Sequence, residues 1–433
     1  MSKTYPTQET KERALLVGIQ SPASLFPVDD CLEELALLAD TAGVDVILTV
    51  KQTLKHIDAG TYIGKGKVQE IADKVVENKI QVVIFDDDLS PAQTKNLEKS
   101  IQCKIIDRSA LILDIFAKRA RTREAKTQVE LAQLQYLLPR LTRIWTHLER
   151  QAGGGVFTKG PGETQLETDR RLVGQRIAVL KEELKKIESQ RKTQRASRDG
   201  IFKVALVGYT NVGKSTLLNT LSDAGVFVEN RLFATLDATS RKVFLNKDYE
   251  CIITDTVGFI RKLPHDLVAS FRSTLEEVHE SDILLHVVDL SNHLFDEQME
   301  TVQTVLAELK ASEKPTIIVF NKVDRITDDT LLTQMKKRFP GSIYISAARR
   351  IGIDKLKNAL IAQLQNDYVV RTIKMDASDG KLYSMIRHLT EILHESHKET
   401  RLTIKFRARK EDAEKIERYQ QKYKDRDKIS STA

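Results

Sequence analysis

The sequence predicts a multidomain α/β protein in which a long antiparallel helical hairpin separates two stretches of alternating strands and helices. In both stretches, short apolar runs of strand length alternate with helical patterns, which is typical of parallel sheets with crossover helices. Between them the strand pattern stops, and apolar residues instead recur at steps of three and four. The chain has 433 residues, which allows about three domains.

The first 110 residues are expected to form a small N-terminal α/β domain. Apolar runs of strand length lie at residues 14–19, 44–50, 81–86 and 104–107. Helical patterns lie between them at residues 31–42, 67–78 and 91–100. This alternation predicts a parallel sheet whose strands are joined by helices.

Two features of this first domain each have two interpretations. A Gly-Lys-Gly-Lys run at residues 64–67, within TYIGKGKVQE, precedes a helical pattern. It could be a second phosphate-binding turn, or a structural turn with solvated lysines, since its spacing matches neither phosphate-loop fingerprint. Three aspartates at 86–88 could bind a cation, but the Ser-Pro pair that follows is typical of a helix start.

Residues 111–199 are expected to form a basic helical hairpin. Apolar residues repeat at heptad spacing in two runs, which are Leu131, Leu134, Leu138, Leu141, Trp145 and Leu148, and then Val173, Ile177, Leu180, Leu184 and Ile187. Two such runs describe two long antiparallel helices, with a kink expected at Pro139. Residues 114–199 hold 19 basic and 11 acidic residues, a net charge of +8. A polyanionic partner is expected to bind here.

The segment that joins the two helices is AGGGVFTKGPGETQLETDRR, residues 152–171. Five glycines and a proline in its first eleven residues exceed what a solvated turn needs, which predicts backbone that approaches a partner closely. Lys159, Arg170 and Arg171 are the candidate nucleic-acid-binding residues, because lysine and arginine contact phosphates.

A phosphate-binding motif lies at residues 208–215. The sequence GYTNVGKS fits G-x-x-x-x-G-K-[S/T] and stands between a β-branched strand and the start of an apolar-periodic helix. Lys214 would reach the β- and γ-phosphates and serve catalysis, and Ser215 would ligate Mg²⁺. The residues expected to contact nucleotide here are Gly208, Tyr209, Thr210, Asn211, Val212, Gly213, Lys214, Ser215 and Thr216.

Three further motifs follow at predicted strand ends. DTVG ends one apolar strand, NKVD ends another and SAA follows a third; their residues are Asp255, Thr256, Val257 and Gly258, then Asn321, Lys322, Val323 and Asp324, then Ser346, Ala347 and Ala348. Asp255 would hold Mg²⁺ through water, and Gly258 would sense the γ-phosphate. Asp324 can accept two hydrogen bonds from the edge of guanine that carries N1–H and the 2-amino group, and adenine does not offer this edge. Residues 200–366 are therefore predicted to be a GTP-hydrolysing domain with a mostly parallel sheet and helices on both faces.

The C-terminal residues 367–433 are predicted to form a small α/β domain with a charged tail. A strand is expected at 369–375, a helix at 381–393, a strand at 401–407 and a helix at 412–423. Residues 401–433 hold 11 basic and 6 acidic residues, a net charge of +5. A solvated tail without a dedicated site is the expectation, although the charge could add a weak nucleic-acid contact.

The glycine-rich segment closely resembles the signature of the HflX family of ribosome-associated GTPases. TYIGKGKVQEI and the order of parts along residues 10–365 resemble that family too. The resemblance implies a factor that binds the large ribosomal subunit and its RNA and helps to separate stalled ribosomes into subunits. An alternative is a nucleotide-regulated RNA-binding or remodelling protein with a second nucleotide site in the N-terminal domain.

The resemblance also guides the choice of a switch threonine. Either Thr235 or Thr239 could complete the Mg²⁺ shell, and FATLD resembles the family's switch segment, so Thr235 is chosen as metal ligand and catalytic residue. The neighbouring nucleotide contacts are expected at Phe233, Ala234, Thr235, Leu236 and Asp237.

Phe259 stands where many GTPases carry a water-orienting glutamine, so intrinsic hydrolysis is expected to be slow and to be stimulated by the ribosome. Asn211 could ligate K⁺ as a substitute for an arginine finger, or could bond only within its own turn.

The remaining expectations concern location and assembly. No apolar run approaches ~20 residues, and the first residues lack the apolar region of a signal peptide. Three scattered cysteines, Cys31, Cys103 and Cys251, fit a reducing compartment. We expect a cytoplasmic monomer with no integral membrane association.

Overall fold

The computed structural model describes residues 11–22, 26–144, 165–196, 201–223, 232–233, 235–247, 249–262, 277–398 and 401–430. The chain forms two compact units. Unit 1 comprises Met1–Leu184, Glu229–Asp237 and Ile260–Arg272, and unit 2 comprises Lys185–Val228, Ala238–Phe259 and Ser273–Ala433. The predicted multidomain α/β class is confirmed, and we keep 110, 199 and 366 as proposed domain boundaries.

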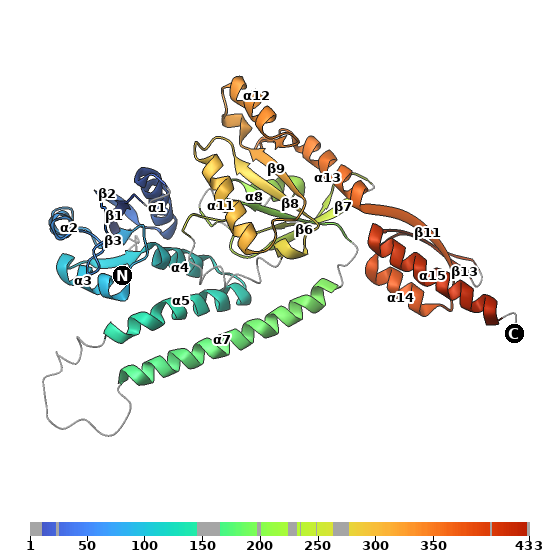
Figure 1. Ribbon diagram of the computed structural model, residues 1–433, viewed down its shortest axis with the longest axis horizontal. Coiled ribbons are helices and arrows are strands. Elements are labelled where there is room, and N and C mark those ends of the chain that lie inside the picture. Colours follow the sequence, from blue (N-terminus) through green and yellow to red (C-terminus); the bar gives the residue numbers. More distant parts are fainter. Residues whose placement is uncertain are drawn as a thin grey trace, which may run out of the picture. The chain divides into compact units, whose positions relative to one another are not determined.

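Unit 1 begins with a four-stranded parallel sheet, as predicted. Its strand order is β2 (Asp45–Thr53), β1 (Arg13–Gln20), β3 (Val82–Phe85) and β4 (Lys104–Asp107). Its helices are α1 (Val28–Ala42), α2 (Lys65–Glu77), α3 (Pro91–Ile101) and α4 (Arg108–Arg119). Figure 1 shows this sheet in blue with its helices around it.

The two faces of this sheet are covered by different helices. Alternate residues of β1, such as Leu15 and Val17, share a core with α2 and α3. Gly18 faces the other way, where a Cβ atom would lie 2.7 Å from Val28 Cγ2 of α1. Glycine at this position therefore lets α1 approach the sheet closely.

Local signals decide where helix α3 begins. Ser90 caps α3 by accepting a hydrogen bond from the Gln93 backbone N–H, and the Gln93 side chain accepts one from the Ser90 backbone N–H. Pro91 occupies the first helical position, where a missing N–H costs nothing. The predicted helix start is confirmed. Helix α2 begins at Lys65, two residues earlier than expected.

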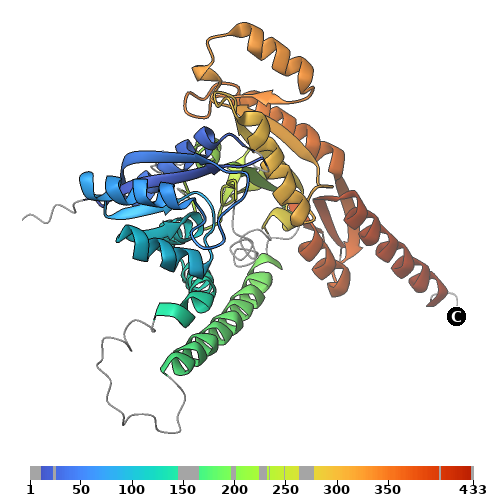
Figure 2. The same ribbon diagram turned by 60° about the vertical axis from the view of Figure 1, so that its left-hand side comes forward.

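The hairpin consists of α5 (Arg123–Ile144) and α7 (Gln165–Ala196). Their apolar residues pack together as the heptad spacing predicted, and this cluster contains Leu131, Leu134, Leu138, Val173, Ile177, Leu180 and Leu184. Arg176 and Glu130 pair across the two helices at 2.7 Å. Figures 1 and 2 both show α5 and the adjoining part of α7 side by side. Helix α5 continues through Pro139, so the kink stays a prediction, and Trp145 and Leu148 lie outside the described residues.

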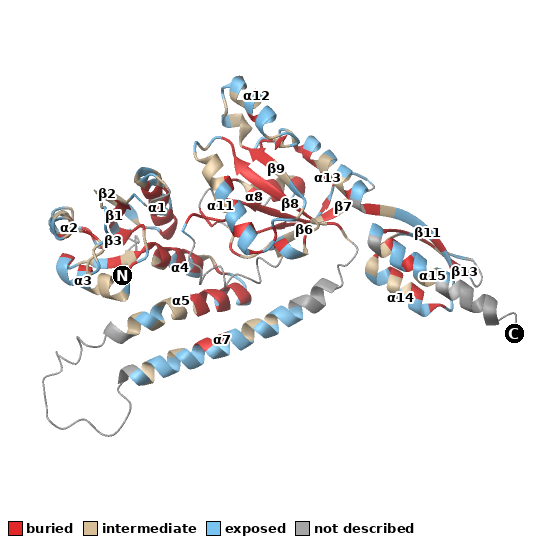
Figure 3. Ribbon diagram, in the orientation of Figure 1, coloured by how far each residue is buried: buried red, intermediate tan, exposed pale blue. Residues whose placement is uncertain are grey.

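Unit 2 contains a six-stranded sheet that is parallel except for one edge strand. Its order is β10 (Ile343–Tyr344), β9 (Thr316–Asn321), β8 (Ile283–Asp289), β5 (Lys203–Gly208), β7 (Glu250–Asp255) and β6 (Thr239–Phe244), with β6 antiparallel to β7. Its principal helices are α8 (Lys214–Leu221), α11 (Phe295–Glu308), α12 (Asp329–Arg338) and α13 (Ile353–Asp367). Every residue of β8 is buried (Figure 3), as expected of a parallel strand covered on both faces.

The C-terminal domain differs from its prediction. It contains β11 (Tyr368–Asp376), α14 (Gly380–Leu389), β12 (Glu391–Lys398), β13 (Arg401–Arg409) and α15 (Lys410–Ser430). The helix predicted at 381–393 was wrong in its last residues, because Thr390 turns to an extended conformation and the chain then pairs with β13. The sequence EILHESHK lacks the apolar alternation of a strand, and pairing with β13 rather than local pattern makes it one.

Among the described residues, no helix combines the length and the apolar character that crossing a bilayer requires. Cys31, Cys103 and Cys251 are all free thiols, and Cys103 is only half-buried.

Candidate functional site

The phosphate-binding motif lies between β5 and α8, as predicted. Gly208 and Gly213 have φ angles of 151° and 96°, conformations that side chains disfavour. A Cβ atom on Gly208 would lie 2.3 Å from the Val287 carbonyl oxygen, and one on Gly213 would lie 2.4 Å from Asn321 Nδ2. At both positions glycine is needed for two reasons: a Cβ atom would have no space, and the φ angle disfavours residues with side chains. The turn places backbone N–H groups at the start of α8, where helices bind anions.

Lys214 is the first residue of α8, and its side chain is buried. Its ammonium donates hydrogen bonds to the Tyr209 carbonyl at 2.7 Å and the Gly208 carbonyl at 3.1 Å. Burial lowers the pKa of Lys214 to about 8, against a smaller opposing effect of the Asp255 carboxylate. A nearby phosphate would restore the full positive charge.

Two candidate Mg²⁺ ligands meet at the ends of neighbouring elements. The Ser215 hydroxyl on α8 donates to the Asp255 carboxylate at the end of β7, at 2.6 Å. Nearby in the loop, the buried Thr210 hydroxyl has no hydrogen-bond partner in the part of the chain that the structure describes. Among the described residues, no three His, Cys, Asp or Glu side chains gather into a metal site. A hydroxyl with one carboxylate fits Mg²⁺ completed by phosphate and water, which is how this ion is usually bound.

Gly258 and Phe259 follow Asp255 and contact the phosphate-binding loop. A Cβ atom on Gly258 would lie 2.8 Å from Thr210 Cα and 2.9 Å from Lys214 Nζ. The Phe259 N–H donates to the Gly208 carbonyl at 3.1 Å, and the Thr210 N–H donates to the Phe259 carbonyl at 2.8 Å. Because the Phe259 side chain is buried, it does not point toward solvent.

The NKVD and SAA motifs lie together at the carboxyl ends of β9 and β10. The Asn321 amide donates to the Val212 carbonyl at 2.8 Å, and its oxygen accepts from the Ala347 N–H at 2.9 Å. Asn321 thus connects the phosphate-binding loop to the SAA loop. Lys322 donates to the Asn211 carbonyl at 2.8 Å and pairs with Asp289 at 2.7 Å.

Asp324, the residue expected to bind guanine, lies in a short 3-10 helix, Val323–Arg325, that follows β9. A hydrogen bond from the Ser346 hydroxyl lowers the pKa of Asp324, and Arg349, 3.4 Å away, adds to this effect. The carboxylate is therefore ionised at neutral pH, as a double acceptor for guanine must be.

The predicted switch residues belong to unit 1. Phe233 packs edge-on against Phe116 of α4, with ring centroids 4.7 Å apart. Asp237 accepts hydrogen bonds from the Thr122 hydroxyl and backbone. Thr235 lies between these two anchored residues, Leu236 beside it is buried, and Ala234 lies outside the described residues. Thr239, the other candidate, is exposed at the start of β6, opposite Asp255.

A buried charged cluster holds the residues directly after Phe259, and the sequence did not predict it. Arg261 pairs with Glu34 at 2.9 Å, and Lys262 pairs with Asp86 at 2.5 Å. Arg108 bridges the cluster by pairing with Asp86 at 2.7 Å and Glu34 at 3.2 Å. Asp86 thus binds cationic side chains of the chain itself. Burial raises the pKa of Asp86, and the neighbouring Arg108 and Lys262 charges act against that rise.

The Gly-Lys-Gly-Lys run is engaged by its own domain. The Gly64 N–H donates to the Gln52 side chain at 3.2 Å, and Lys67 pairs with Glu70 at 2.7 Å. Lys65 lies in the first turn of α2. These contacts favour the structural turn over a second nucleotide site.

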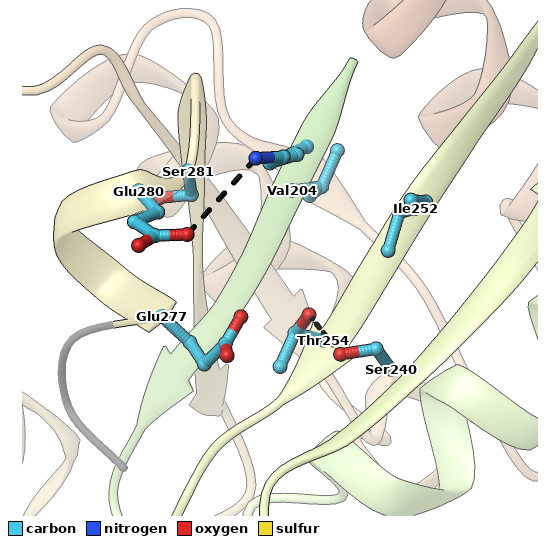
Figure 4. A pocket seen from close by; sticks show the side chains of 8 residues that line it. Val204, Ser240, Ile252, Thr254, Glu277, Glu280 and Ser281 are labelled. Atoms are coloured by element: carbon cyan, nitrogen blue, oxygen red, sulfur yellow. Dashed lines mark hydrogen bonds and ion pairs between the residues drawn. The ribbon is translucent and has the colours of Figure 1, made fainter. Parts of the chain in front are cut away.

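A small polar cavity lies at the opposite end of β5 from the phosphate-binding loop (Figure 4). Lys203 and Glu280 lie 4.0 Å apart beside it, and the Ser240 and Thr254 hydroxyls are 2.9 Å apart. Its volume of about 20 Å³ suits a water molecule, not a nucleotide.

His286 in β8 is a buried titratable residue that the sequence reasoning missed. Burial, with a smaller contribution from the Lys214 charge, lowers the pKa of His286 to about 4. The imidazole is therefore neutral at physiological pH. A histidine within an otherwise apolar strand was the only signal for it.

Two of the three candidate RNA-binding residues lie on α7. Arg170 and Arg171 are exposed near its start, and Lys159 lies outside the described residues. The apolar stripe of α7 faces α5, so these arginines lie in solvent.

The fold and its ordered motifs define this protein as a P-loop GTPase. Three family models match the chain: a GTP-binding GTPase N-terminal domain at 29–117, a GTP-binding GTPase middle region at 119–198 and a 50S ribosome-binding GTPase at 203–322. The chain belongs to the HflX family of GTPases.

Relatives named GTPase HflX are similar over most of the chain. The protein from Flavobacterium psychrophilum is 52% identical over 75% of this chain and 79% of its own length. That from Escherichia coli is 44% identical over 90% of this chain and 91% of its own length. A solved GTP-binding protein from Sulfolobus solfataricus in complex with GDP is 26% identical, with a TM-score of 0.43, over 82% of this chain and 98% of that one. The membership rests on the sequence relatives and the family models.

Proposed function

We propose that this GTPase binds the large ribosomal subunit and promotes the splitting or rescue of stalled ribosomes. The observation that carries the proposal is the hairpin. Pairing of α5 with α7 buries their shared apolar stripe and leaves Arg170 and Arg171 exposed at the end that enters the glycine-rich segment. Exposed cations suit a structured RNA, and the glycine content of the neighbouring segment favours close approach to such a partner. The match to a 50S ribosome-binding GTPase supports the same partner.

Hydrolysis would proceed by attack of water on the γ-phosphate, in line with the leaving oxygen. Lys214 and the loop N–H groups would stabilise the charge that develops on the phosphates. Mg²⁺, held by Ser215 and by Asp255 through water, with Thr235 completing its shell, would neutralise further phosphate charge. Gly258 would donate its N–H to the γ-phosphate. Its place beside Lys214, where an added Cβ atom would lie 2.9 Å from Nζ, supports this role.

We expect intrinsic hydrolysis to be slow and to be stimulated by the ribosome. Buried Phe259 replaces a side chain that could orient the attacking water. The test is GTP hydrolysis by the full chain with and without purified large subunits. A rate that the subunits leave unchanged would contradict the proposal.

The role of the hairpin can be tested separately. Deleting residues 153–162 should abolish splitting while GDP affinity stays unchanged. Neutralising Lys159, Arg170 and Arg171 together should weaken subunit binding and reduce the salt slope by roughly 0.7–0.9 per lost phosphate contact. Unchanged splitting after the deletion would show that the segment is only a connector.

K⁺ is a proposed cofactor at Asn211. This residue is exposed, with a φ angle of 60°, a left-handed conformation that asparagine tolerates. Its backbone carbonyl is held by Lys322, which leaves the side-chain oxygen for an ion near the phosphates. Turnover at matched ionic strength should be faster in K⁺ than in Na⁺, and Asn211→Ser should remove the difference. Equal rates in both salts would assign Asn211 to the turn alone.

A further inference from the structure

The C-terminal domain carries a sheet face to which the motifs and family models assign no role. The three family matches end at residue 322, before this domain begins. Its sheet has the order β11-β13-β12. Helices α14 and α15 pack on one face, over a core that includes Ile373, Ile404 and Phe406. The opposite face of the sheet is not part of this core.

Strand register defines which side chains share that opposite face. One rung across the three strands holds Lys374, Thr403 and Ser396, and the next holds Thr372, Lys405 and His394. A third rung pairs Asp376 with Arg401. We call these eight residues the distal face. Side chains two apart on one strand lie on the same side of a sheet, so the distal face is one contiguous surface.

The distal face is exposed and positively charged. Lys374, Arg401 and Lys405 are exposed, and Asp376 is its single acidic residue, which leaves a net charge of +2. Lys374 and Lys405 make no ion pair with any other residue that the structure describes, whereas the helical side engages Arg371 with Glu417 at 2.9 Å. Lys374 and Lys405 lie opposite Thr403 and Thr372, so the two lysines are diagonal neighbours on adjacent strands. Their positive charges favour an anionic partner.

The other end of the same face is already occupied by the GTPase domain. Arg407 lies over the Tyr249 ring at 4.4 Å and pairs with Glu391 at 3.0 Å. Arg409 pairs with Asp282 at the start of β8. These contacts hold the sheet to the domain that carries the phosphate-binding loop, while the distal face extends beyond them. Figure 3 shows exposed residues along the middle of β11.

We propose that the distal face binds the sugar–phosphate backbone of a structured RNA. Lysine, arginine, serine and threonine are the side chains that contact phosphates. Protein–protein interface cores are instead enriched in large aromatic residues and depleted in lysine, and the distal face has no phenylalanine, tyrosine or tryptophan. Sheets that read single-stranded bases also need aromatic residues for stacking. The distal face therefore suits RNA backbone rather than bases or an acidic protein.

This inference extends the proposed function, and it rests on that function only for the identity of the RNA. The probe is a fluorescent RNA hairpin of about 20 base pairs, titrated with the full chain between about 50 and 200 mM KCl. The test variant is Lys374→Gln/Arg401→Gln/Lys405→Gln. The matched control is Lys381→Gln/Lys410→Gln/Arg418→Gln, which removes the same charge from exposed positions on α14 and α15 of the same domain.

The distal-face variant should weaken RNA binding by about tenfold and lower the salt slope by about 2, while the control changes affinity by less than about twofold. Both variants should melt and bind GDP like the parent chain. Equal losses in both variants, or no loss in the first, would overturn the inference. Competition by polyglutamate as effective as that by unlabelled RNA would also overturn it, in favour of an acidic protein. Subunit splitting is measured in parallel, because its loss on deleting residues 153–162 tests the proposed function and does not depend on this face.

Discussion

Binding of GDP should be coupled to protonation of Lys214. Its ammonium lies among backbone carbonyls in a buried site, and its pKa is about 8. Nucleotide phosphates would raise that pKa toward or above the ordinary value of a lysine, about 10.4. At pH 8, half of the nucleotide-free molecules carry a neutral Lys214, so binding should take up about 0.5 proton per GDP. At pH 7 the uptake through this group should fall to about 0.1.

The same linkage sets the direction of the affinity change. Because the protonated form binds better, GDP affinity should fall about fourfold from pH 7.0 to 8.5. Titration calorimetry at pH 8 in buffers of different ionisation enthalpy measures the proton count directly. Lys214→Arg is the matched control, since its guanidinium stays protonated and should take up none. Zero uptake or proton release by the parent chain at pH 8 would refute the reasoning.

Three further predictions concern single residues. Asp324→Asn should weaken GTP binding by on the order of 2–4 kcal/mol and favour XTP, because the amide loses the paired acceptors for guanine. Competition binding measures this, with Asp328→Asn as the control, and unchanged GTP affinity would refute it. Gly258→Ala should lower the hydrolysis rate by about 10²-fold, because its methyl group would displace Lys214 or Thr210, whereas Gly174→Ala, which meets no atom within 4 Å, should leave it unchanged. His286 has a folded pKa of about 4, below its unfolded value of about 6.5, so between about pH 6.5 and 4 the unfolded chain binds more protons than the folded chain. The free energy of unfolding should therefore fall by about 3 kcal/mol as the pH drops through this range. Urea unfolding should show that His286→Leu loses this part of the pH dependence.

The elements around the nucleotide motifs could be predicted because their signals are local. Gly208 and Gly213 have φ angles that residues with side chains rarely adopt, and each motif directly follows an apolar strand. The seam between α5 and α7 was predictable for the same reason, since heptad spacing is visible in one chain segment.

The features that were missed depend on residues far apart in sequence. Lys262 pairs with Asp86 across 176 positions, and no periodicity records such a pair. Strand β12 exists because β13 pairs with it, while its own sequence is charged and irregular. His286 took its lowered pKa from surrounding burial, which a sequence pattern does not measure.

The buried cluster around Arg108 has a practical consequence for dissecting this protein. A fragment that starts at residue 200 would retain all four nucleotide motifs. It would also expose Arg261, whose carboxylate partner Glu34 is absent from the fragment, and Phe233, which packs on Phe116. Both residues lie in segments that adjoin the nucleotide motifs in the sequence. Without their partners, these segments would fold in a different environment. Hydrolysis rates measured on such a fragment would not represent those of the whole chain. Kinetic comparisons should therefore use the whole chain.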